Sequence, residues 1–157
     1  MDDLREGFDN NLGRMIGKLH HLMWEAGRHR LASAGLDLDM KQAILLANLW
    51  YHEGMCQNEI TRKFGKHKAG ITRSIDRLEE KALVVRVTDT SDRRLKMIYL
   101  TQKGKELCTR IVPILNATED TVLKGVSVKH ATICKEVLRQ AFLNLEAYRN
   151  QIDPAAV

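Results

Sequence analysis

A mainly helical chain with one small β-hairpin is the fold class that the sequence predicts. Apolar residues recur at three- and four-residue steps along most of the chain, as they do on the buried stripe of an amphipathic helix. Two short runs, LVVRVTD at 83–89 and KMIYLT at 96–101, are instead rich in β-branched and aromatic residues, which favour strands. With 157 residues, 44% of them hydrophobic, the chain can build one core with helical extensions.

Four helices are expected before the hairpin. The periodicity of apolar residues places the first over residues 8–30. Asp39 stands three residues before Gln42, which is the spacing of a capping box, and this predicts the start of a second helix that continues through Trp50. Gly65 ends a short third helix and precedes the fourth, and these two cover residues 58–64 and 66–81.

The second half of the chain begins with the hairpin, whose tip TSDRRL is polar and charged. Thr101 directly follows the second strand and can cap a helix that begins at Gln102. Pro113 should kink this helix, because the proline ring removes one backbone hydrogen bond. Ser127 is expected to cap the last helix, whose apolar residues keep a near-heptad spacing.

The order of short helix, tight turn, helix and hairpin is that of a winged helix-turn-helix module. In such a module the second helix of the pair, the recognition helix, enters the major groove of DNA, and the hairpin, or wing, reaches the minor groove or the phosphates. Positive charge is concentrated in the same region: residues 57–105 hold 13 Lys and Arg and 6 Asp and Glu, whereas the rest of the chain is slightly acidic. The alternative interpretation of such a segment is a solvated basic face.

The recognition helix should bury Ile71, Ile75 and Leu78. Arginine can hold guanine through two hydrogen bonds, threonine and alanine methyls can contact the thymine methyl, and lysine suits phosphate. The opposite face of the helix offers side chains of these kinds together with one acid: Lys68, Ala69, Thr72, Arg73 and Asp76, with Arg77 at the edge.

The stretch KAGITRSIDRLEEKALVVRVTDTSDRRLKMIYLTQKGKEL, residues 68–107, resembles the MarR family of bacterial transcriptional regulators. The resemblance rests on T-R-x-x-D-R-L-E-E-K at 72–81 and on D-x-x-D-R-R…L-T-x-x-G-K at 89–105. It implies a homodimer on a double-stranded DNA operator of inverted half-sites. It also implies a regulator, most often a repressor, that holds a promoter shut until a small phenolic or lipophilic molecule, an oxidant or a metal alters the dimer.

By this resemblance, Asp92 braces Arg94 at the wing tip, while Arg93 and Lys96 meet phosphate or share the minor groove. An ordinary exposed ion pair, worth well under ~1 kcal/mol, is the alternative. His67, just before the recognition helix, would be either a cap or a phosphate contact. The full set of candidate DNA contacts is Lys66, His67, Lys68, Ala69, Gly70, Thr72, Arg73, Arg77, Asp92, Arg93, Arg94 and Lys96.

The chain departs from the family early in the recognition helix. Many members have small hydroxyl residues there, where this chain has Ala69 and Gly70. Glycine lowers helix propensity by roughly 1 kcal/mol relative to alanine, but it allows a close backbone approach. The resemblance therefore does not carry direct base readout over to these two positions.

The resemblance also implies the domain organisation, with a DNA-binding winged helix-turn-helix domain over 38–105 and a helical dimerisation region formed by 1–37 and 106–157. Apolar stripes at both ends of the chain agree with this organisation. The compact DNA-binding domain can cover only a fraction of these stripes, so a second copy of the chain must cover the rest. The residues expected in the dimer interface are Leu12, Met15, Leu19, Leu22, Val137, Leu138, Phe142 and Leu145.

Effectors of the family bind in the cleft between the two regions. Aromatic, basic and apolar side chains there would suit a small aromatic or lipophilic effector, although Trp and Met at helical spacing more often belong to a core. The candidates are His20, Trp24, Arg28, Met40 and Trp50. No cofactor and no metal are expected, since Gly54 should end the helix between His52 and Cys56.

Other classes of protein are weighed against this interpretation. The sequence has no G-x-x-x-x-G-K-[ST], G-x-G-x-x-G, H-E-x-x-H or C-x-x-C motif, so an enzyme is not expected. The start MDDLREGFDNN is acidic and polar, and no apolar run approaches a membrane span, so we expect a cytoplasmic protein without a membrane partner. Two alternatives stay open: a redox- or metal-responsive regulator of the same fold, and a winged-helix module that binds protein instead of DNA.

Overall fold

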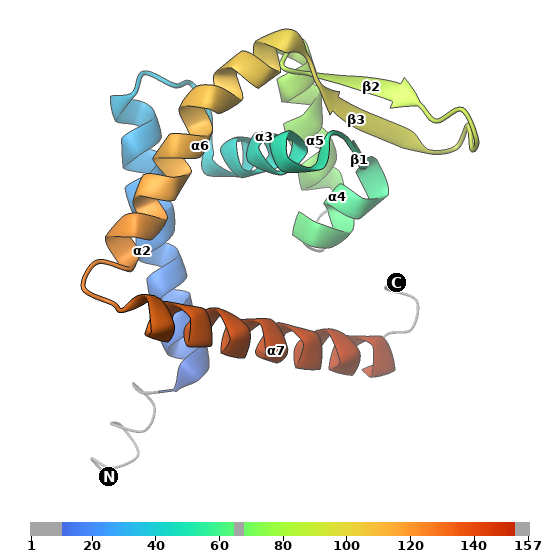
Figure 1. The fold of residues 1–157 in the computed structure, drawn as a ribbon. Coiled ribbons are helices and arrows are strands. Elements are labelled where there is room, and N and C mark those ends of the chain that lie inside the picture. Colours follow the sequence, from blue (N-terminus) through green and yellow to red (C-terminus); the bar gives the residue numbers. More distant parts are fainter. Residues whose placement is uncertain (1–10, 65–67, 153–157) are drawn as a thin grey trace. The chain divides into compact units, whose positions relative to one another are not determined.

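The computed structural model describes residues 11–64 and 68–152 and confirms a mainly helical fold with a small antiparallel sheet (Figure 1). Its elements in chain order are α2 (Leu12–Ser33), α3 (Met40–His52), β1 (Met55–Cys56), α4 (Gln57–Phe64), α5 (Lys68–Glu80), β2 (Val84–Thr88), β3 (Lys96–Leu100), α6 (Gln102–Val122) and α7 (Val128–Ile152). The chain divides into a larger unit that ends at Glu119, within α6, and a smaller unit that begins at Asp120. Across the described ranges, no helix is both long enough and apolar enough to cross a membrane.

The caps expected for three helices are present. The Asp39 side chain accepts a hydrogen bond from the Gln42 backbone N at 2.8 Å, and the Gln42 side chain accepts one from the Asp39 backbone N at 3.1 Å, which closes the capping box of α3. Thr101 Oγ1 accepts from the Gly104 backbone N at 3.0 Å at the start of α6. Ser127 Oγ accepts from a backbone N of α7 at 3.2 Å. These bonds satisfy donors that a helix start leaves unpaired.

The first described helix begins later than the sequence predicts. Asn11 has an extended backbone, and its side chain accepts a hydrogen bond from the Gly13 backbone N at 2.9 Å, so α2 starts at Leu12. The helix continues to Ser33, beyond the predicted end at residue 30. Farther along the chain, α6 runs past Pro113 without ending.

The hairpin belongs to a three-stranded sheet, whereas the sequence predicts two strands. β2 pairs with one edge of β3, with Arg86 opposite Ile98, and β1 pairs with the other edge, with Met55 also opposite Ile98. Gly54 leads into β1 at φ 110°, and a Cβ at this position would collide with the Tyr99 ring. β1 was missed because two residues are too few to show the alternation of a strand.

The core of the larger unit joins the helices to the sheet. The predicted inner face of α5 is confirmed, since Ile71, Ile75 and Leu78 are all buried. α2 comes close to α3 at Gly27, where an added Cβ would lie 2.7 Å from Met40 Cε. The largest fully buried side chains are Leu31, Leu45, Leu46, Leu49, Ile60, Ile75, Leu78, Ile98, Cys108 and Ile111. Burying each large apolar side chain contributes about 1.5–3 kcal/mol to folding.

Gly104 allows the start of α6 to lie against the chain between α5 and β2. A Cβ here would collide with the Leu83 carbonyl oxygen, which also accepts a hydrogen bond from the Thr101 backbone N at 3.1 Å. We expect Gly104→Ala to lower the free energy of unfolding by at least about 1 kcal/mol, because the backbone must shift to admit the methyl group. Urea denaturation measures this loss.

Gly17→Ala is the matched control for Gly104→Ala. Apart from the neighbouring backbone of its own helix, no atom lies within 4 Å of a Cβ built at Gly17, which is exposed in α2. The control should leave the free energy of unfolding unchanged or raise it by up to about 1 kcal/mol through helix propensity. An equal loss of stability in both variants would contradict the close approach at Gly104.

Candidate nucleic-acid interface

One face of α5 is buried and the opposite face is open to solvent. Ile71 and Ile75 fix this orientation, because both pack into the core. A helix with small and basic side chains on its open face can lie in the major groove and reach base edges. The described residues that give α5 this character are Ala69, Gly70, Arg73 and Arg77, all of them exposed. The candidates Lys66 and His67, and the side chain of Lys68, lie outside the described residues.

Two candidate contact residues of α5 hold partners within the protein. Thr72 Oγ1 accepts a hydrogen bond from Gln57 Nε2 of α4 at 3.4 Å. Arg73 Nε donates to the carbonyl oxygen of Ala69, one helical turn earlier, at 3.3 Å. Both bonds are long and neither is deeply buried, so either side chain can exchange its partner for a base or a phosphate at small cost.

The tip of the hairpin is an ordered turn built around Asp89. Its Oδ1 accepts from the Ser91 backbone N at 2.8 Å, from the Asp92 backbone N at 3.0 Å, and from the Ser91 hydroxyl. The Leu95 backbone N donates to the Asp92 carbonyl at 2.9 Å, which closes the turn on its other side. The hydrogen bonds, above all that of the Ser91 hydroxyl, hold the pKa of Asp89 below its ordinary value.

Arg94 and Asp92 form a bidentate ion pair at this tip. Arg94 Nε and Nη2 donate to the two carboxylate oxygens of Asp92 at 3.0 and 3.1 Å, and the Arg94 backbone N donates to Oδ1 at 3.0 Å. The hydrogen bonds from Arg94 lower the pKa of Asp92, and the same contact raises the pKa of Arg94. The Arg94 side chain is 90% exposed and that of Asp92 35%, so the carboxylate orients the guanidinium while leaving it accessible.

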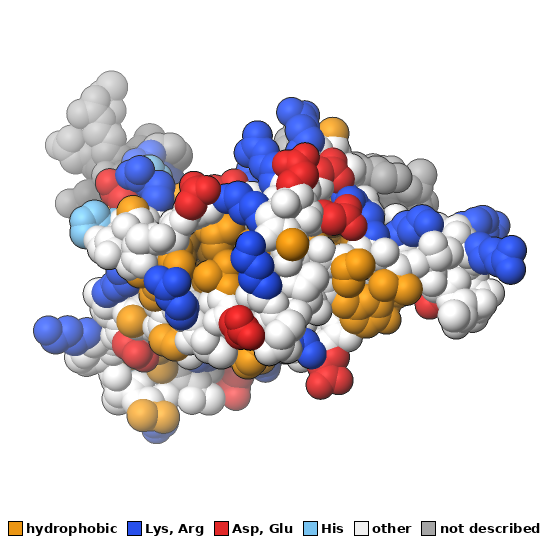
Figure 2. Space-filling view, turned by 90° about the horizontal axis from the view of Figure 1, so that it is seen from above, with side chains coloured by type: hydrophobic (Ala, Val, Ile, Leu, Met, Phe, Trp, Pro, Cys, Tyr) orange, Lys and Arg blue, Asp and Glu red, His pale blue; other side chains and the backbone are white. Residues whose placement is uncertain are grey.

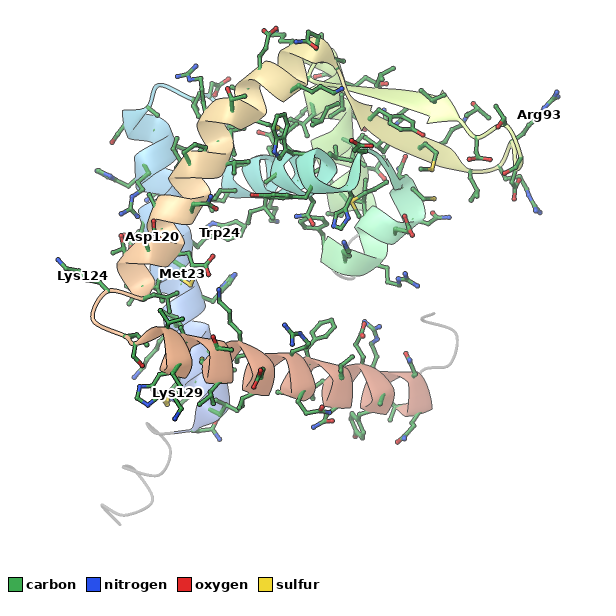
Figure 3. All side chains as sticks on the ribbon, in the orientation of Figure 1. Met23, Trp24, Arg93, Asp120, Lys124 and Lys129 are labelled. Atoms are coloured by element: carbon green, nitrogen blue, oxygen red, sulfur yellow. The ribbon has the colours of Figure 1, made fainter. Side chains whose placement is uncertain are left out.

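The remaining basic residues of the wing lie on either side of this pair. Arg93 is at the end of the tip and points away from the hairpin (Figure 3). Lys96, the first residue of β3, donates from Nζ to Thr88 Oγ1 of β2 at 2.6 Å. The space-filling view shows Lys and Arg side chains gathered at the free end of the hairpin (Figure 2). Cations that extend beyond the folded body in this way can reach the phosphates or a narrow minor groove.

The structure adds a partner for Asp76 that the sequence pattern did not indicate. Its side chain is 45% exposed, on the side of α5 where the pattern places it, and its carboxylate forms an ion pair with Arg86 of β2. The same guanidinium forms a second ion pair with Glu79, one helical turn farther along α5. The sequence does contain a signal for this contact. Asp76 and Glu79 are three residues apart and so lie on one side of a helix, and Arg86 is two residues after Val84 and so points to the same side of the strand.

The five effector-binding candidates have different environments. Met40 belongs to the core at 6% exposure, and Trp24, half-buried, packs against that core. The rings of His20 and Trp24 have centroids 5.6 Å apart, and Arg28 is exposed on the same helix. Trp50 lines a pocket whose seven lining residues include none of the other four.

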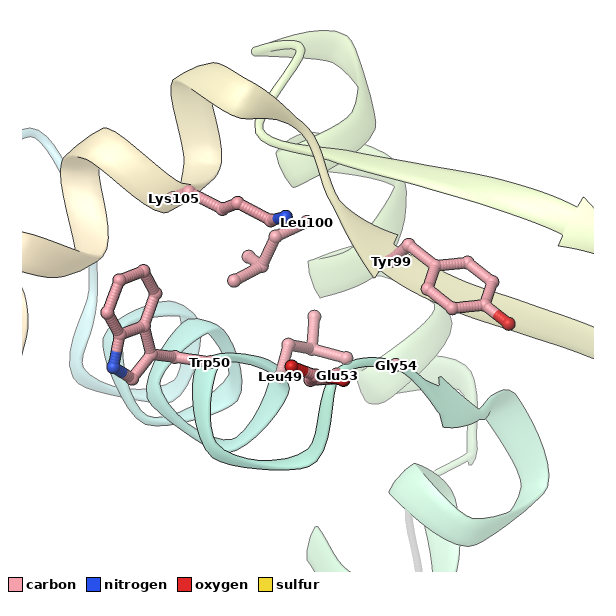
Figure 4. A pocket seen from close by; sticks show the side chains of 7 residues that line it. All are labelled: Leu49, Trp50, Glu53, Gly54, Tyr99, Leu100 and Lys105. Atoms are coloured by element: carbon pink, nitrogen blue, oxygen red, sulfur yellow. The ribbon is translucent and has the colours of Figure 1, made fainter.

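This pocket lies among the end of α3, β3 and the start of α6 and has a volume of about 500 Å³ (Figure 4). The aromatic rings of Trp50 and Tyr99, both more than one-third exposed, belong to its walls. Its size falls in the range of small-molecule sites. Sequence reasoning singled out Trp50 but not the others of the lining set, which is Leu49, Trp50, Glu53, Gly54, Tyr99, Leu100 and Lys105.

The three cysteines are free thiols in separate environments. Cys108 is buried in the core, and burial raises the pKa of its thiol to about 11, which keeps it protonated near neutral pH. Cys56 is half-buried and Cys134 is exposed. Within residues 11–64 and 68–152, no three His, Cys, Asp or Glu side chains form a group that could hold a metal ion.

The arrangement of α5 and the hairpin is similar to that of known proteins. Residues 38–96 match the model of the MarR family. The fold is similar to that of a MarR-family transcriptional regulator from Listeria monocytogenes in complex with a 26-mer DNA, at a TM-score of 0.82 and 17% identity, covering 93% of this chain and 96% of that one.

Two further structures share the fold. A MarR variant from E. coli in complex with operator DNA matches at a TM-score of 0.72 and 19% identity, over 83% of this chain and 92% of that one. BpsR from Bordetella bronchiseptica, whose DNA binding is regulated by 6-hydroxynicotinic acid, matches at a TM-score of 0.74 and 18% identity. The match covers 85% of this chain and 94% of that one. Residues 38–96 of this chain are therefore similar to the MarR family, and the fold of the chain is the winged helix-turn-helix fold of these MarR-family structures.

Proposed function

We propose that this protein is a sequence-specific DNA-binding transcriptional regulator, a homodimeric repressor that leaves a pseudo-palindromic operator when a small molecule binds. The observation that carries the proposal is the exposed Arg94, held in a bidentate pair by Asp92 at the tip of the wing of a MarR-family domain. A flexible arginine loses rotamer entropy when it enters a narrow minor groove, and a carboxylate that orients it beforehand reduces this loss.

The recognition helix supplies the second part of the proposed interface. Arg73 and Arg77 are exposed on α5 and can donate to guanine O6 and N7 in the major groove. Lys96 and Arg93 on the wing are suited to phosphates, which fix the position of the protein on the duplex but carry little sequence information. In this mechanism α5 makes the major-groove base contacts, Arg94 contributes the minor-groove contact, and affinity comes from both elements.

A homodimer is supported by apolar side chains that the single chain leaves open. α2 and α7 each present a stripe of large residues to solvent, each residue between 40% and 69% exposed, and covering such a stripe with a second copy is favourable. We accordingly keep residues 38–105 as the DNA-binding domain and residues 1–37 and 106–157 as the dimerisation region. The proposed interface residues are Leu12, Met15, Leu19, Leu22, Val137, Leu138, Phe142 and Leu145.

The proposed signal is a small aromatic or lipophilic molecule. The regulation of BpsR by 6-hydroxynicotinic acid supports this class of effector. An effector that weakens operator binding tenfold must prefer the DNA-incompetent dimer by roughly 1.4 kcal/mol. The protonated, buried thiol of Cys108 disfavours a peroxide signal at that position.

The proposed function is tested by comparing Arg73→Ala with Lys96→Ala. Both remove one exposed cation, but a base contact gives specificity whereas a phosphate contact positions the protein on any sequence. Arg73→Ala should reduce the ratio of operator to random-duplex affinity by about 1–3 kcal/mol, and Lys96→Ala should weaken both duplexes about equally. The measurement is fluorescence anisotropy on an operator selected from random duplexes and on a scrambled duplex.

A salt titration of the unmodified protein accompanies this comparison. Affinity for random duplex should fall steeply between roughly 50 and 200 mM salt, because bound phosphates release counterions. A winged-helix module that binds protein instead of DNA would show no duplex binding at any of these salt concentrations. That result would remove the proposed function.

A further inference from the structure

We infer that Arg86 is a positioning residue, which sets the wing at a fixed orientation to the recognition helix through Asp76 and Glu79. The inference rests on the proposed function, since it concerns how two DNA-reading elements are aligned. Arg86 itself is not one of the candidate DNA contacts. The three residues belong to the same compact unit, and α5 packs against β2 within it.

The contacts of Arg86 join one strand to two turns of one helix. Its Nη2 pairs with Asp76, its Nη1 pairs with Glu79, and its backbone N donates to Glu79 Oε1 at 3.2 Å. A planar guanidinium that holds two carboxylates on one helix restricts both sliding and rotation of that helix against the strand. A single ion pair would restrict these motions less.

Arg86 lies in the part of the wing that is anchored to the core, so a rotation of the hairpin against the core would begin near it. It stands in the middle of β2, opposite Ile98, which is completely buried in β3. Its side chain is 22% exposed, whereas those of Asp76 and Glu79 are 45% and 38% exposed, so the cation is the most sheltered member. The wing tip lies roughly 15 Å farther along the hairpin at a rise of about 3.3 Å per residue, so a small rotation at Arg86 becomes a larger displacement of Arg94.

Charge gives the same trio a second effect. Asp76 and Glu79 lie on the helix that is expected to enter the groove, where two uncompensated carboxylates would repel phosphates. Arg86 compensates them from the protein side. A role in charge alone and a role in positioning therefore predict different results when the cation and the carboxylates are removed separately.

The experiment uses two full-length variants of opposite charge change. Arg86→Met removes the cation, and Asp76→Asn with Glu79→Gln removes both anions. Affinities are measured for the operator duplex selected with the parent protein and for a scrambled duplex of the same length. Positioning predicts that both variants lower the ratio of operator to scrambled affinity, by about tenfold, because both break the link between β2 and α5.

A role in charge alone gives a different pattern. Arg86→Met would then weaken both duplexes equally, the carboxamide variant would strengthen both equally, and the ratio would stay at the parent value in each. That pattern would overturn the inference while leaving the proposed function intact. Absence of duplex binding by the parent would instead remove the proposed function, so the two failures are distinguishable.

A second measurement tests whether Arg86 acts through the wing. In the Arg86→Met background, the loss caused by Arg94→Ala should be at least about threefold smaller than in the parent, because the tip is already misplaced. Equal losses in the two backgrounds would overturn the inference. Arg86→Lys keeps the charge but cannot pair with Asp76 and Glu79 in one plane. Its ratio of operator to scrambled affinity should therefore fall between the ratios of the parent and of Arg86→Met.

The matched control is Lys81→Met. Lys81, directly after α5, also neutralises a carboxylate, since its Nζ lies 2.7 Å from Oδ2 of Asp37 in the segment before α3, but it does not join the helix to the wing. The control should leave the ratio of operator to scrambled affinity unchanged. If thermal melting shows that Arg86→Met is unfolded, Arg86→Lys and the carboxamide variant decide the inference by the same ratio.

Discussion

A chain that ends at Val126, and so lacks α7, is expected to lose operator affinity by at least about 100-fold, although every candidate DNA contact remains in it. The two recognition helices of a dimer engage half-sites about one DNA turn apart, roughly 34–36 Å, and binding of the first half-site raises the effective concentration at the second. α7 has no buried residue in the single chain, which agrees with a role in pairing. Sedimentation and anisotropy measure the dimer and the affinity.

Point variants in the full chain separate pairing from folding. Phe142→Glu with Leu145→Glu places two charges on the exposed apolar stripe of α7 and should give the same loss of dimer and of operator affinity. Asn150→Glu, on the same helix, is the control and should preserve both. Circular dichroism should show that the larger unit, whose core ends before α7, stays folded in every variant. A soluble truncated monomer that binds one half-site as tightly as the parent binds its operator would refute the dimer.

Arg94→Ala is expected to lower operator affinity by about 1–3 kcal/mol, the size of a good specific contact. Its guanidinium is exposed and already oriented by Asp92, so its removal should take away the proposed groove contact and leave the fold unaffected. Asp92→Asn should cause a smaller loss, because Arg94 remains but one of its two charge-assisted bonds is weakened. Anisotropy gives the affinities, and thermal melting should show no change in stability.

The control for the wing is Arg139→Ala. This removes an equally charged, exposed side chain from α7 and should change operator affinity by much less than Arg94→Ala. If the Arg94 and Asp92 variants bound the operator like the parent, the wing would not be part of the interface. The pair would then be an ordinary exposed ion pair, worth well under ~1 kcal/mol.

Local sequence signals were sufficient for most of the fold. The capping box at Asp39 and the caps at Thr101 and Ser127 depend on residues three positions away, so their spacing is visible in the sequence. The buried face of α5 follows in the same way from Ile71 and Ile75, whose four-residue spacing matches one helical turn.

Features that depend on contacts between different elements were not predicted. β1 exists because Met55 meets Ile98, and two residues carry no strand pattern of their own. The contact of Asp76 with Arg86 crosses from a helix to a strand, so helical phase alone could not indicate this ion pair. The candidate DNA contacts of the wing came from a motif, and the structure adds the geometry by which Asp92 holds Arg94.

The short strand β1 also has a consequence for the order in which the protein folds. The β2–β3 hairpin pairs residues such as Val84 and Leu100, which are near each other along the chain, and a contact of this kind forms with little loss of chain entropy. The pairing of Met55 with Ile98 instead closes a loop of roughly 40 residues that includes α4 and α5. The wing can therefore form early as a local hairpin, and the third strand joins it when the helices between them have packed.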